Sequence, residues 1–337
     1  MYFPVTYSTL SDKALAQYLR TQYSIQNLLK TSYYLRGMND TYLVTTTSDE
    51  KFIFRVYRGD WRKEYSEIAF ELELLRHLSQ NRISVSLPIA DIHGEFIQAI
   101  DAPEGRRFGV LFTFAEGSER GIDNEEISSA FGKAVANIHL QGDSFKSDYA
   151  RPQLNLYYLI NQSLDIIEAG MGYRKDDFEF IKEVGKALEQ ALLDIPLNQL
   201  DWGICHGDLH GNTNVSFTKD LVMTHYDFDL CGYGWRAYDI AEFRLAREVR
   251  LSHDPDQLER LWSAFIEGYH SIRALSENDL RAVPIFVGIR QLWLMGLCLS
   301  DPHITGSIDY GDEFIDEKLD YFKQLKEHLY GSYPEIL

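Results

Sequence analysis

The sequence predicts an α+β fold, with a small, mainly antiparallel sheet first and a larger, mainly helical part after it. Short β-rich runs separated by turn residues fill most of residues 1–114, one amphipathic helix interrupts them, and helical patterns dominate from about residue 124. At 337 residues the chain is long for one domain and has room for two lobes. We expect one lobe over residues 1–114, a second over 115–337, and a hinge at about 111–117.

The expected elements of the first lobe follow from the periodicity of apolar side chains. Residues 12–23 place Leu15, Leu19 and Tyr23 on one face, which predicts a short amphipathic helix. Residues 64–78 carry leucine and isoleucine at near-helical spacing and predict a second helix. Strands are expected at 32–35, 41–47, 51–58, 88–89 and 108–114. In the second lobe only one hairpin, at 214–229, is expected to interrupt the helices.

Charge is distributed unevenly along the chain. Residues 1–114 carry 13 basic and 13 acidic side chains, whereas residues 115–337 carry 20 basic and 38 acidic ones. The net charge of −18 therefore lies entirely after residue 114. Because nucleic acid selects basic surfaces, this acidic half argues against a nucleic-acid partner. The same charge would attract a small cationic acceptor molecule, and solubility alone is the alternative explanation of the acidity.

Composition also bears on localisation. The first six residues contain neither a basic stretch nor an apolar run, so no signal peptide is expected. No segment is expected to approach the long, uncharged apolar run that is required to span a membrane. The three cysteines follow no pattern, which is typical of a reducing cytoplasm. We therefore predict a cytoplasmic protein without a membrane partner.

The most informative stretches are two aspartate motifs. Residues 205–215 read CHGDLHGNTNV and contain Asp208, and residues 226–229 read YDFD and contain Asp227. Phosphoryl transfer needs one carboxylate that orients the attacking hydroxyl and another that holds the magnesium ion on the nucleotide phosphates. The two motifs supply candidates for both positions.

The first motif also matches the opening metal motif of binuclear metallophosphatases over residues 207–211. That class needs a second carboxylate block, a Gly-Asn-His ligand set and later histidines with ligand spacing. After residue 211 the sequence offers Asp227 and Asp229 but no Gly-Asn-His set, and its later histidines lack ligand spacing, so a hydrolase is the weaker alternative.

Further motifs occur in an order that resembles the aminoglycoside phosphotransferase and choline kinase family. The resemblance is nearest to its homoserine-kinase-like and bacterial stress-response-kinase branch. It spans nearly the whole chain and rests on the two aspartate motifs and on residues 37–42, 54–58, 71–75, 111–117, 131–139 and 232–241. It implies a bilobal protein-kinase-like fold, with nucleotide bound in the first lobe and the catalytic loop and acceptor site in the second.

The resemblance implies the roles of the aspartates. Asp208 would be the catalytic base or, since an ordinary carboxylate with a pKa near ~4 is a weak base, the group that orients the acceptor hydroxyl. Asp227 would bind magnesium, with Asp229 as the alternative on the same face of one strand. The family places a second magnesium-binding Asn where this chain has Thr213. We favour Asn214 for that role, with Asn212 as the alternative.

The resemblance also implies a cation for the nucleotide phosphates. The family usually has Lys where this chain has Arg55, which keeps the charge and can hold phosphate through its planar fork. Its expected partner is Glu71, with Glu67 as the alternative. The neighbouring Arg58 and Arg62 are expected to be surface charges. Loss of the Lys leaves a pseudokinase as an alternative.

The remaining nucleotide contacts are expected from two backbone segments. The turn over residues 36–42 contains Gly37 and Asn39 and would approach the phosphates. The hinge would contact adenine through backbone groups around Thr113, Phe114 and Ala115.

Other residues of the second lobe are expected to be structural. His206 would brace the catalytic loop, His210 would brace it or touch substrate, and Asp239 would cap its backbone. Arg290 lies in an apolar helix and is expected to pack against the lobe, with contact to an anionic substrate group as the alternative.

These inferences predict an ATP- and Mg²⁺-dependent phosphotransferase that is a monomer or a homodimer. The acceptor would be the hydroxyl of an amino alcohol, a homoserine-like metabolite or an aminoglycoside-like compound. A serine/threonine protein kinase and a non-catalytic nucleotide-binding pseudokinase are the alternatives.

Overall fold

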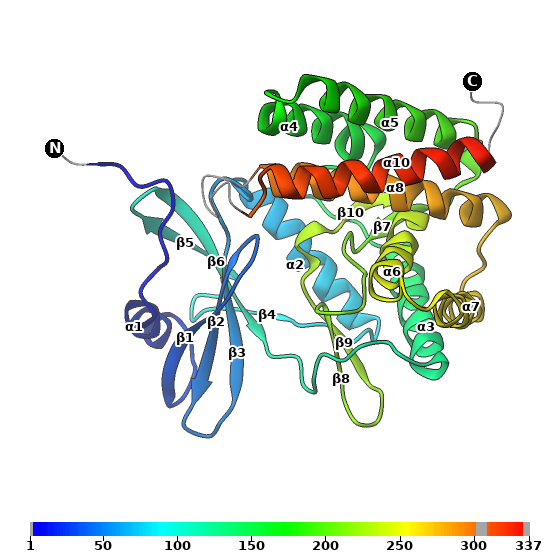
Figure 1. Cartoon of the computed structure of the whole chain (residues 1–337). Helices are drawn as coiled ribbons and strands as arrows, with labels where there is room; N and C mark the ends of the chain where they lie inside the picture. The colour runs from blue at the N-terminus through cyan, green and yellow to red at the C-terminus, as the bar shows by residue number, and fades with distance from the viewer. Residues whose placement is uncertain (1–2, 301–308, 333–337) are drawn as a thin grey trace. The chain divides into compact units, whose positions relative to one another are not determined.

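This computed structural model describes residues 3–300 and 309–332, with side chains described up to residue 327 (Figure 1). The chain forms two compact units, which are described separately. Unit 1 comprises Met1–Gly121, Ser144–Arg151 and Asn212–Asp229, and unit 2 comprises Ile122–Asp143, Pro152–Gly211 and Leu230–Leu337. The predicted division into lobes after residue 114 stays a prediction, while the α+β class is confirmed.

An antiparallel sheet forms the centre of unit 1. Its strands lie in the order β1, β2, β3, β6 and β4, and β5 pairs with β6 beside this path. They span Leu28–Arg36 (β1), Asp40–Thr46 (β2), Lys51–Val56 (β3), Pro88–Ile89 (β4), Ile97–Ala102 (β5) and Gly105–Thr113 (β6). Two helices belong to the unit, α1 (Asp12–Gln22) and α2 (Tyr65–Gln80). The sequence analysis missed β5, whose short alternating segment is recognisable mainly by its pairing with β6.

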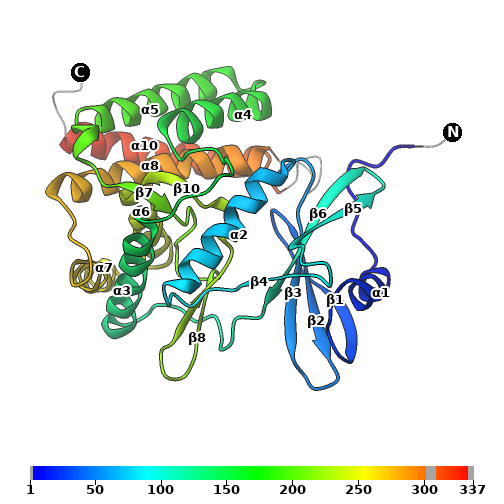
Figure 2. The same cartoon turned by 180° about the vertical axis from the view of Figure 1, so that it is seen from behind.

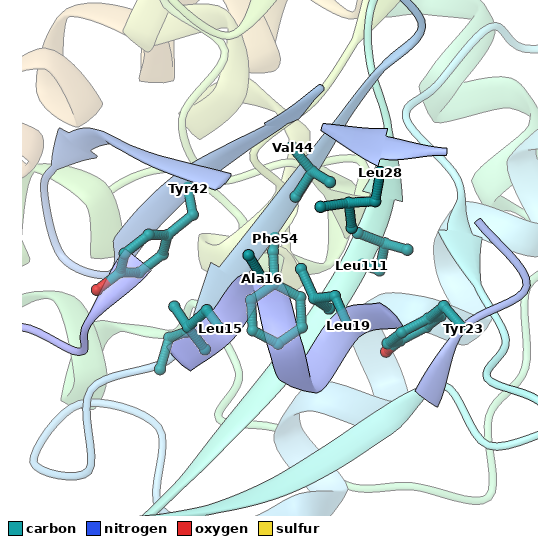
Figure 3. Packing of buried hydrophobic residues seen from close by; sticks show 10 residues of the cluster. Leu15, Ala16, Leu19, Tyr23, Leu28, Tyr42, Val44, Phe54 and Leu111 are labelled. Carbon is teal, nitrogen blue, oxygen red and sulfur yellow. The ribbon is translucent and has the colours of Figure 1, made fainter. Parts of the chain in front are cut away.

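Helix α1 packs its apolar face on one side of the sheet (Figure 3). The side chain of Ser11 accepts a hydrogen bond from the backbone of Ala14 and begins the helix. Leu19 is fully buried, in one cluster with Phe54 of β3 and Leu111 of β6. This packing confirms the amphipathic helix that the spacing of its leucines predicted.

A short hairpin carries the second aspartate motif. Strands β8 (Val215–Phe217) and β9 (Met223–His225) pair in antiparallel fashion, and β9 is held against the segment around Ser84 through backbone hydrogen bonds of His225. The chain then turns into a 3₁₀ helix, η3 (Phe228–Leu230). The prediction that Asp227 and Asp229 lie on one strand is therefore wrong, because the strand ends before the motif.

Helices dominate unit 2, and several of them run side by side (Figure 1 and, from behind, Figure 2). They are α3 (Glu125–Gly142), η1 (Tyr157–Asn161), α4 (Gln162–Met171), α5 (Lys175–Leu193), η2 (Leu197–Gln199), α6 (Arg236–Arg250), α7 (Pro255–His270), α8 (Glu277–Leu299) and α10 (Asp312–Ser332). Strands β7 (Trp202–Cys205) and β10 (Gly232–Trp235) also pair here. The expectation that one hairpin alone interrupts the helices is therefore wrong. Both strands are only four residues long and their pairing is not local.

Helix α8 corrects the expectation that no segment approaches a membrane span. Among the described residues it is the one helix that is long and apolar enough to cross a membrane, but 78% of its apolar window is buried inside the protein. Such burial is typical of the core helix of a soluble protein.

Candidate active site

A buried ion pair joins strand β3 and helix α2 in unit 1. The Nη1 atom of Arg55 donates to Oε1 of Glu71 at 2.8 Å, and the other Glu71 oxygen accepts from the hydroxyl of Tyr57 at 3.0 Å. Burial raises the pKa of Glu71 above its usual range, although the charge of Arg55 opposes this rise. The structure thus pairs Arg55 with Glu71 and not with Glu67, which was the alternative.

The same arginine contacts the predicted magnesium ligand. Its Nη2 atom donates to Oδ1 of Asp227 at 3.0 Å, and the Asp227 side chain is 50% exposed. Asp227 has a positive φ of 65°, an uncommon backbone conformation in which Asp and Asn are enriched. Backbone strain of this kind clusters at functional sites, where surrounding contacts enforce it.

The β8–β9 hairpin pairs the backbone of Asn214 with that of the residue before Asp227. The carbonyl of Asn214 accepts from the backbone N–H of Tyr226, the residue before Asp227, at 3.0 Å. Asn214 is 1% exposed, and neither polar atom of its side chain has a hydrogen-bond partner among the described residues. A buried amide without partners costs about 1–3 kcal/mol, so a bound ligand would stabilise it. Asn212 is only partly buried.

Asp229 is buried and its carboxylate is occupied by side chains of unit 1. It accepts from Nε of Arg62 at 2.9 Å, from Nε1 of Trp61 at 2.6 Å and from Nδ2 of Asn39 at 3.1 Å. Burial alone would raise the pKa of Asp229, but nearby arginines, Arg62 first, lower it well below its usual range. These contacts favour Asp227 over Asp229 as the metal ligand. The prediction that Arg62 is a surface charge is wrong, and Arg58 is also buried.

The predicted nucleotide loop connects β1 and β2. The backbone N–H of Gly37 donates to the carbonyl of Asn39 at 3.1 Å, and a Cβ added at position 37 would meet nothing within 4 Å. The Asn39 amide donates to Asp229 and accepts from the backbone of Arg58. Asn39 therefore uses its side chain to hold the turn, and its contact with nucleotide stays a prediction.

The predicted hinge begins where β6 ends. Thr113 is engaged with Leu87, because its N–H donates to the Leu87 carbonyl and its hydroxyl accepts from the Leu87 N–H. The adenine contacts expected around Thr113, Phe114 and Ala115 stay a prediction. At Gly117 φ is +105°, and a Cβ there would lie 2.3 Å from the carbonyl oxygen of Phe217. The close approach of two backbones therefore requires glycine at position 117.

The predicted catalytic loop lies in unit 2, directly after β7. Asp239 of α6 accepts from the backbone N–H of His206 at 2.6 Å and from that of Gly207 at 2.8 Å. Gly207 has φ +82°, and a Cβ there would lie 2.3 Å from the carbonyl oxygen of Leu230. These contacts fix the backbone that leads to Asp208.

The Asp208 carboxylate is held from two sides. Its Oδ1 accepts from Nη2 of Arg290 at 2.7 Å, and its Oδ2 lies 3.5 Å from Nε2 of His210. Burial would raise the pKa of Asp208, but the hydrogen bond with His210 and the charge of Arg290 lower it below its usual range. The carboxylate is therefore ionised at neutral pH and suited to accept a hydrogen bond.

Arg290 is the residue that the sequence analysis missed. It was expected to pack, or alternatively to meet an anionic substrate group, but it contacts the predicted catalytic aspartate directly. The available signal was an arginine inside an otherwise apolar helix, since a buried charge requires a partner.

Each unit thus gathers part of the predicted constellation. Unit 1 holds Arg55, Glu71 and Asp227 together, and unit 2 holds Asp208 with its bracing residues. In the described ranges no group of three or more His, Cys, Asp or Glu side chains forms a metal site. Magnesium does not need one, because it commonly binds one or two protein oxygen ligands together with substrate phosphates.

Comparison with known proteins agrees with this chemistry. An uncharacterized protein of Synechocystis sp. is 36% identical over 83% of this chain and 77% of its own length. A homoserine kinase of Agrobacterium fabrum is 25% identical over 83% of this chain and 82% of its own length.

Two solved structures show the same fold. The amicoumacin kinase hAmiN, in complex with AMP-PNP, Ca²⁺ and Ami, has a TM-score of 0.76 at 20% identity, over 95% of this chain and 94% of that one. A microcompartment-associated aminopropanol kinase has a TM-score of 0.73 at 22% identity, over 93% of this chain and 95% of that one. Residues 37–275 match the family described as the phosphotransferase enzyme family, APH. The chain belongs to this phosphotransferase enzyme family.

Proposed function

We propose that this phosphotransferase moves the γ-phosphoryl group of ATP to the hydroxyl of a small, cationic amino alcohol, in a reaction that requires Mg²⁺. The observation that carries the proposal is the buried Arg55–Glu71 pair, with Asp227 at 3.0 Å from the same guanidinium. A buried cation next to a half-exposed carboxylate is suited to hold phosphate oxygens and a divalent ion side by side.

Two residues of unit 1 would hold the metal ion. Asp227 offers a half-exposed carboxylate, and Asn214 offers a buried amide oxygen that lacks a hydrogen-bond partner in the described structure. Both are oxygen ligands of the kind that Mg²⁺ prefers. When bound, the ion neutralises the charge that develops on the phosphates. Arg55 would bind the phosphates through its planar fork, kept in place by Glu71.

Asp208 would orient the acceptor hydroxyl. Its lowered pKa makes it a weak base, so its main contribution would be to accept the hydroxyl hydrogen bond and aim the oxygen at phosphorus. This role needs an ionised, immobile carboxylate.

Charge and the relatives support this acceptor class. The net charge of −18 lies entirely after residue 114, and such a field attracts cations. One relative is a homoserine kinase and one structural neighbour is an aminopropanol kinase. Both names denote acceptors that carry an amine and a hydroxyl.

ADP release by the purified protein tests the proposal. Pools of amino alcohols, homoserine, aminoglycosides and a generic protein substrate are compared for wild type, Asp208→Asn and the control Asp220→Asn, an exposed aspartate of the β8–β9 turn. We expect release that depends on an amino alcohol, is abolished by Asp208→Asn and is unchanged in the control. Activity with the protein substrate alone would indicate a protein kinase. ATP binding without turnover in any pool would indicate a non-catalytic nucleotide-binding protein.

A further inference from the structure

Arg290 makes an unusual set of contacts inside unit 2. Its Nη1 atom donates to the carbonyl of Gly207 at 3.1 Å and lies 2.8 Å from the hydroxyl oxygen of Tyr238, and its Nη2 donates to Asp208 at 2.7 Å. Its Nε lies 2.8 Å from Oε1 of Glu242 as an ion pair, without the alignment of a hydrogen bond. One side chain of α8 thus connects the catalytic loop to α6.

These contacts leave little of the guanidinium for a substrate. The group has five N–H donors, and each of its three nitrogens has at least one partner within the protein. The Arg290 side chain is 3% exposed, whereas that of Asp208 is 22% exposed. The carboxylate can therefore meet an acceptor molecule while the arginine stays behind it.

Hydrogen bonds fix the backbone of the catalytic loop through two N–H groups and one carbonyl. Asp239 accepts from the N–H groups of His206 and Gly207, and Arg290 binds the Gly207 carbonyl. Arg290 contacts the carboxylate of Asp208 as well, so it constrains both the direction of the chain and the rotamer of the side chain. Asp239 makes no such contact with the carboxylate in the described structure.

We propose that Arg290 is a positioning residue that fixes the Asp208 carboxylate in its reactive orientation and keeps it ionised, with Tyr238 and Glu242 holding the guanidinium in place. The inference rests on the proposed role of Asp208 as the group that orients the acceptor hydroxyl. Arg290 acts through Asp208 and does not contact the acceptor.

Two substitutions of Arg290 distinguish its effect on the orientation of Asp208 from its effect on the ionisation of Asp208. Arg290→Gln removes the charge and the fork, whereas Arg290→Lys keeps the charge but cannot bind Asp208, Gly207 and Tyr238 in one plane. A misplacement of about 1 Å costs on the order of 100-fold in rate. We expect kcat to fall about 10- to 100-fold in both variants, while the KM for nucleotide changes less than about threefold.

The dependence of kcat on pH measures the effect of the Arg290 charge on Asp208. The groups that bear on the ionisation of Asp208 are His206 and His210 from its own loop, Arg290 from α8 and Glu242 from α6. Tyr238 of α6 contacts Arg290, and Asp239 of α6 binds the backbone of the loop. Removing the single positive charge of Arg290 leaves buried acidic neighbours, so Asp208 becomes protonated at higher pH. The acid limb of kcat against pH should therefore move to higher pH in Arg290→Gln and stay near its wild-type position in Arg290→Lys.

The experiment measures kcat, both KM values, the acid limb and the thermal unfolding midpoint of wild type and the two variants. Arg281→Gln is the matched control, because Arg281 is an exposed arginine of the same helix. The inference is overturned if both Arg290 variants match this control in kcat, or if Arg290→Gln raises only the acceptor KM, which would place the arginine on the substrate. If Arg290→Gln does not fold, the inference is tested by the kcat of Arg290→Lys against that of the control alone. Absence of turnover in wild type would instead reject the proposed function.

Discussion

Replacing Glu71 by glutamine removes the negative charge that faces Arg55 while keeping the volume of the side chain. The pair lies inside unit 1 with 2.8 Å between Nη1 and Oε1, and Glu71 is 1% exposed. Breaking a buried ion pair by removing one partner costs about 3–5 kcal/mol. Arg55 keeps Asp227 as a half-exposed partner at 3.0 Å, so we expect the lower end, about 3 kcal/mol of unfolding free energy.

The same substitution should weaken nucleotide binding. Hydrogen bonds of a charged group contribute about 1.5–3 kcal/mol, so a misplaced Arg55 predicts a nucleotide KM about 10- to 100-fold higher. Urea unfolding followed by tryptophan fluorescence and steady-state ADP release measure the two effects. Glu67→Gln is the control, one turn earlier on α2. The reasoning is refuted if Glu71→Gln stays within about 1 kcal/mol of that control and its nucleotide KM within about twofold.

Three further predictions concern unit 1. Asn214→Ala should leave the unfolding free energy within about 1 kcal/mol, because losing the cost of an unpartnered buried amide offsets the cavity that alanine leaves. It should raise the Mg²⁺ concentration for half-maximal activity about tenfold or more. Asn212→Ala should leave the Mg²⁺ requirement unchanged, and the reverse pattern would make Asn212 the ligand. Because the pKa of Asp229 is lowered in the folded state, the unfolded chain binds its proton first as pH falls, so stability is lost below about pH 4. Asp229→Asn should reduce this loss, measured as the unfolding free energy from urea titrations at several pH values. An unchanged dependence of the unfolding free energy on pH would contradict the role given to Asp229. Gly117→Ala should cost at least about 2 kcal/mol of unfolding free energy, because of its φ of +105° and the Phe217 carbonyl, whereas Gly37→Ala should cost less than about 1 kcal/mol.

Local patterns in the sequence determined the elements with strong periodicity and the identity of the central motifs. The helices at residues 12–23 and 64–78 were predictable because apolar side chains at helical spacing must share a buried face. The pairing of Arg55 with Glu71 was also expected, since the motif order placed one on a strand and the other on the following helix. The aspartate motifs and the order of the surrounding motifs pointed to phosphoryl transfer before any distance was known.

Only the tertiary structure decided which charges are buried together. Arg62 and Arg290 looked like a surface charge and a packing residue, because their partners lie 167 and 82 positions away in the chain. Strands β7 and β10 were missed for the same reason, since four-residue strands are specified by their pairing more than by their own pattern. A buried ion pair depends on desolvation and on geometry between distant segments, and neither is encoded in a local run of residues.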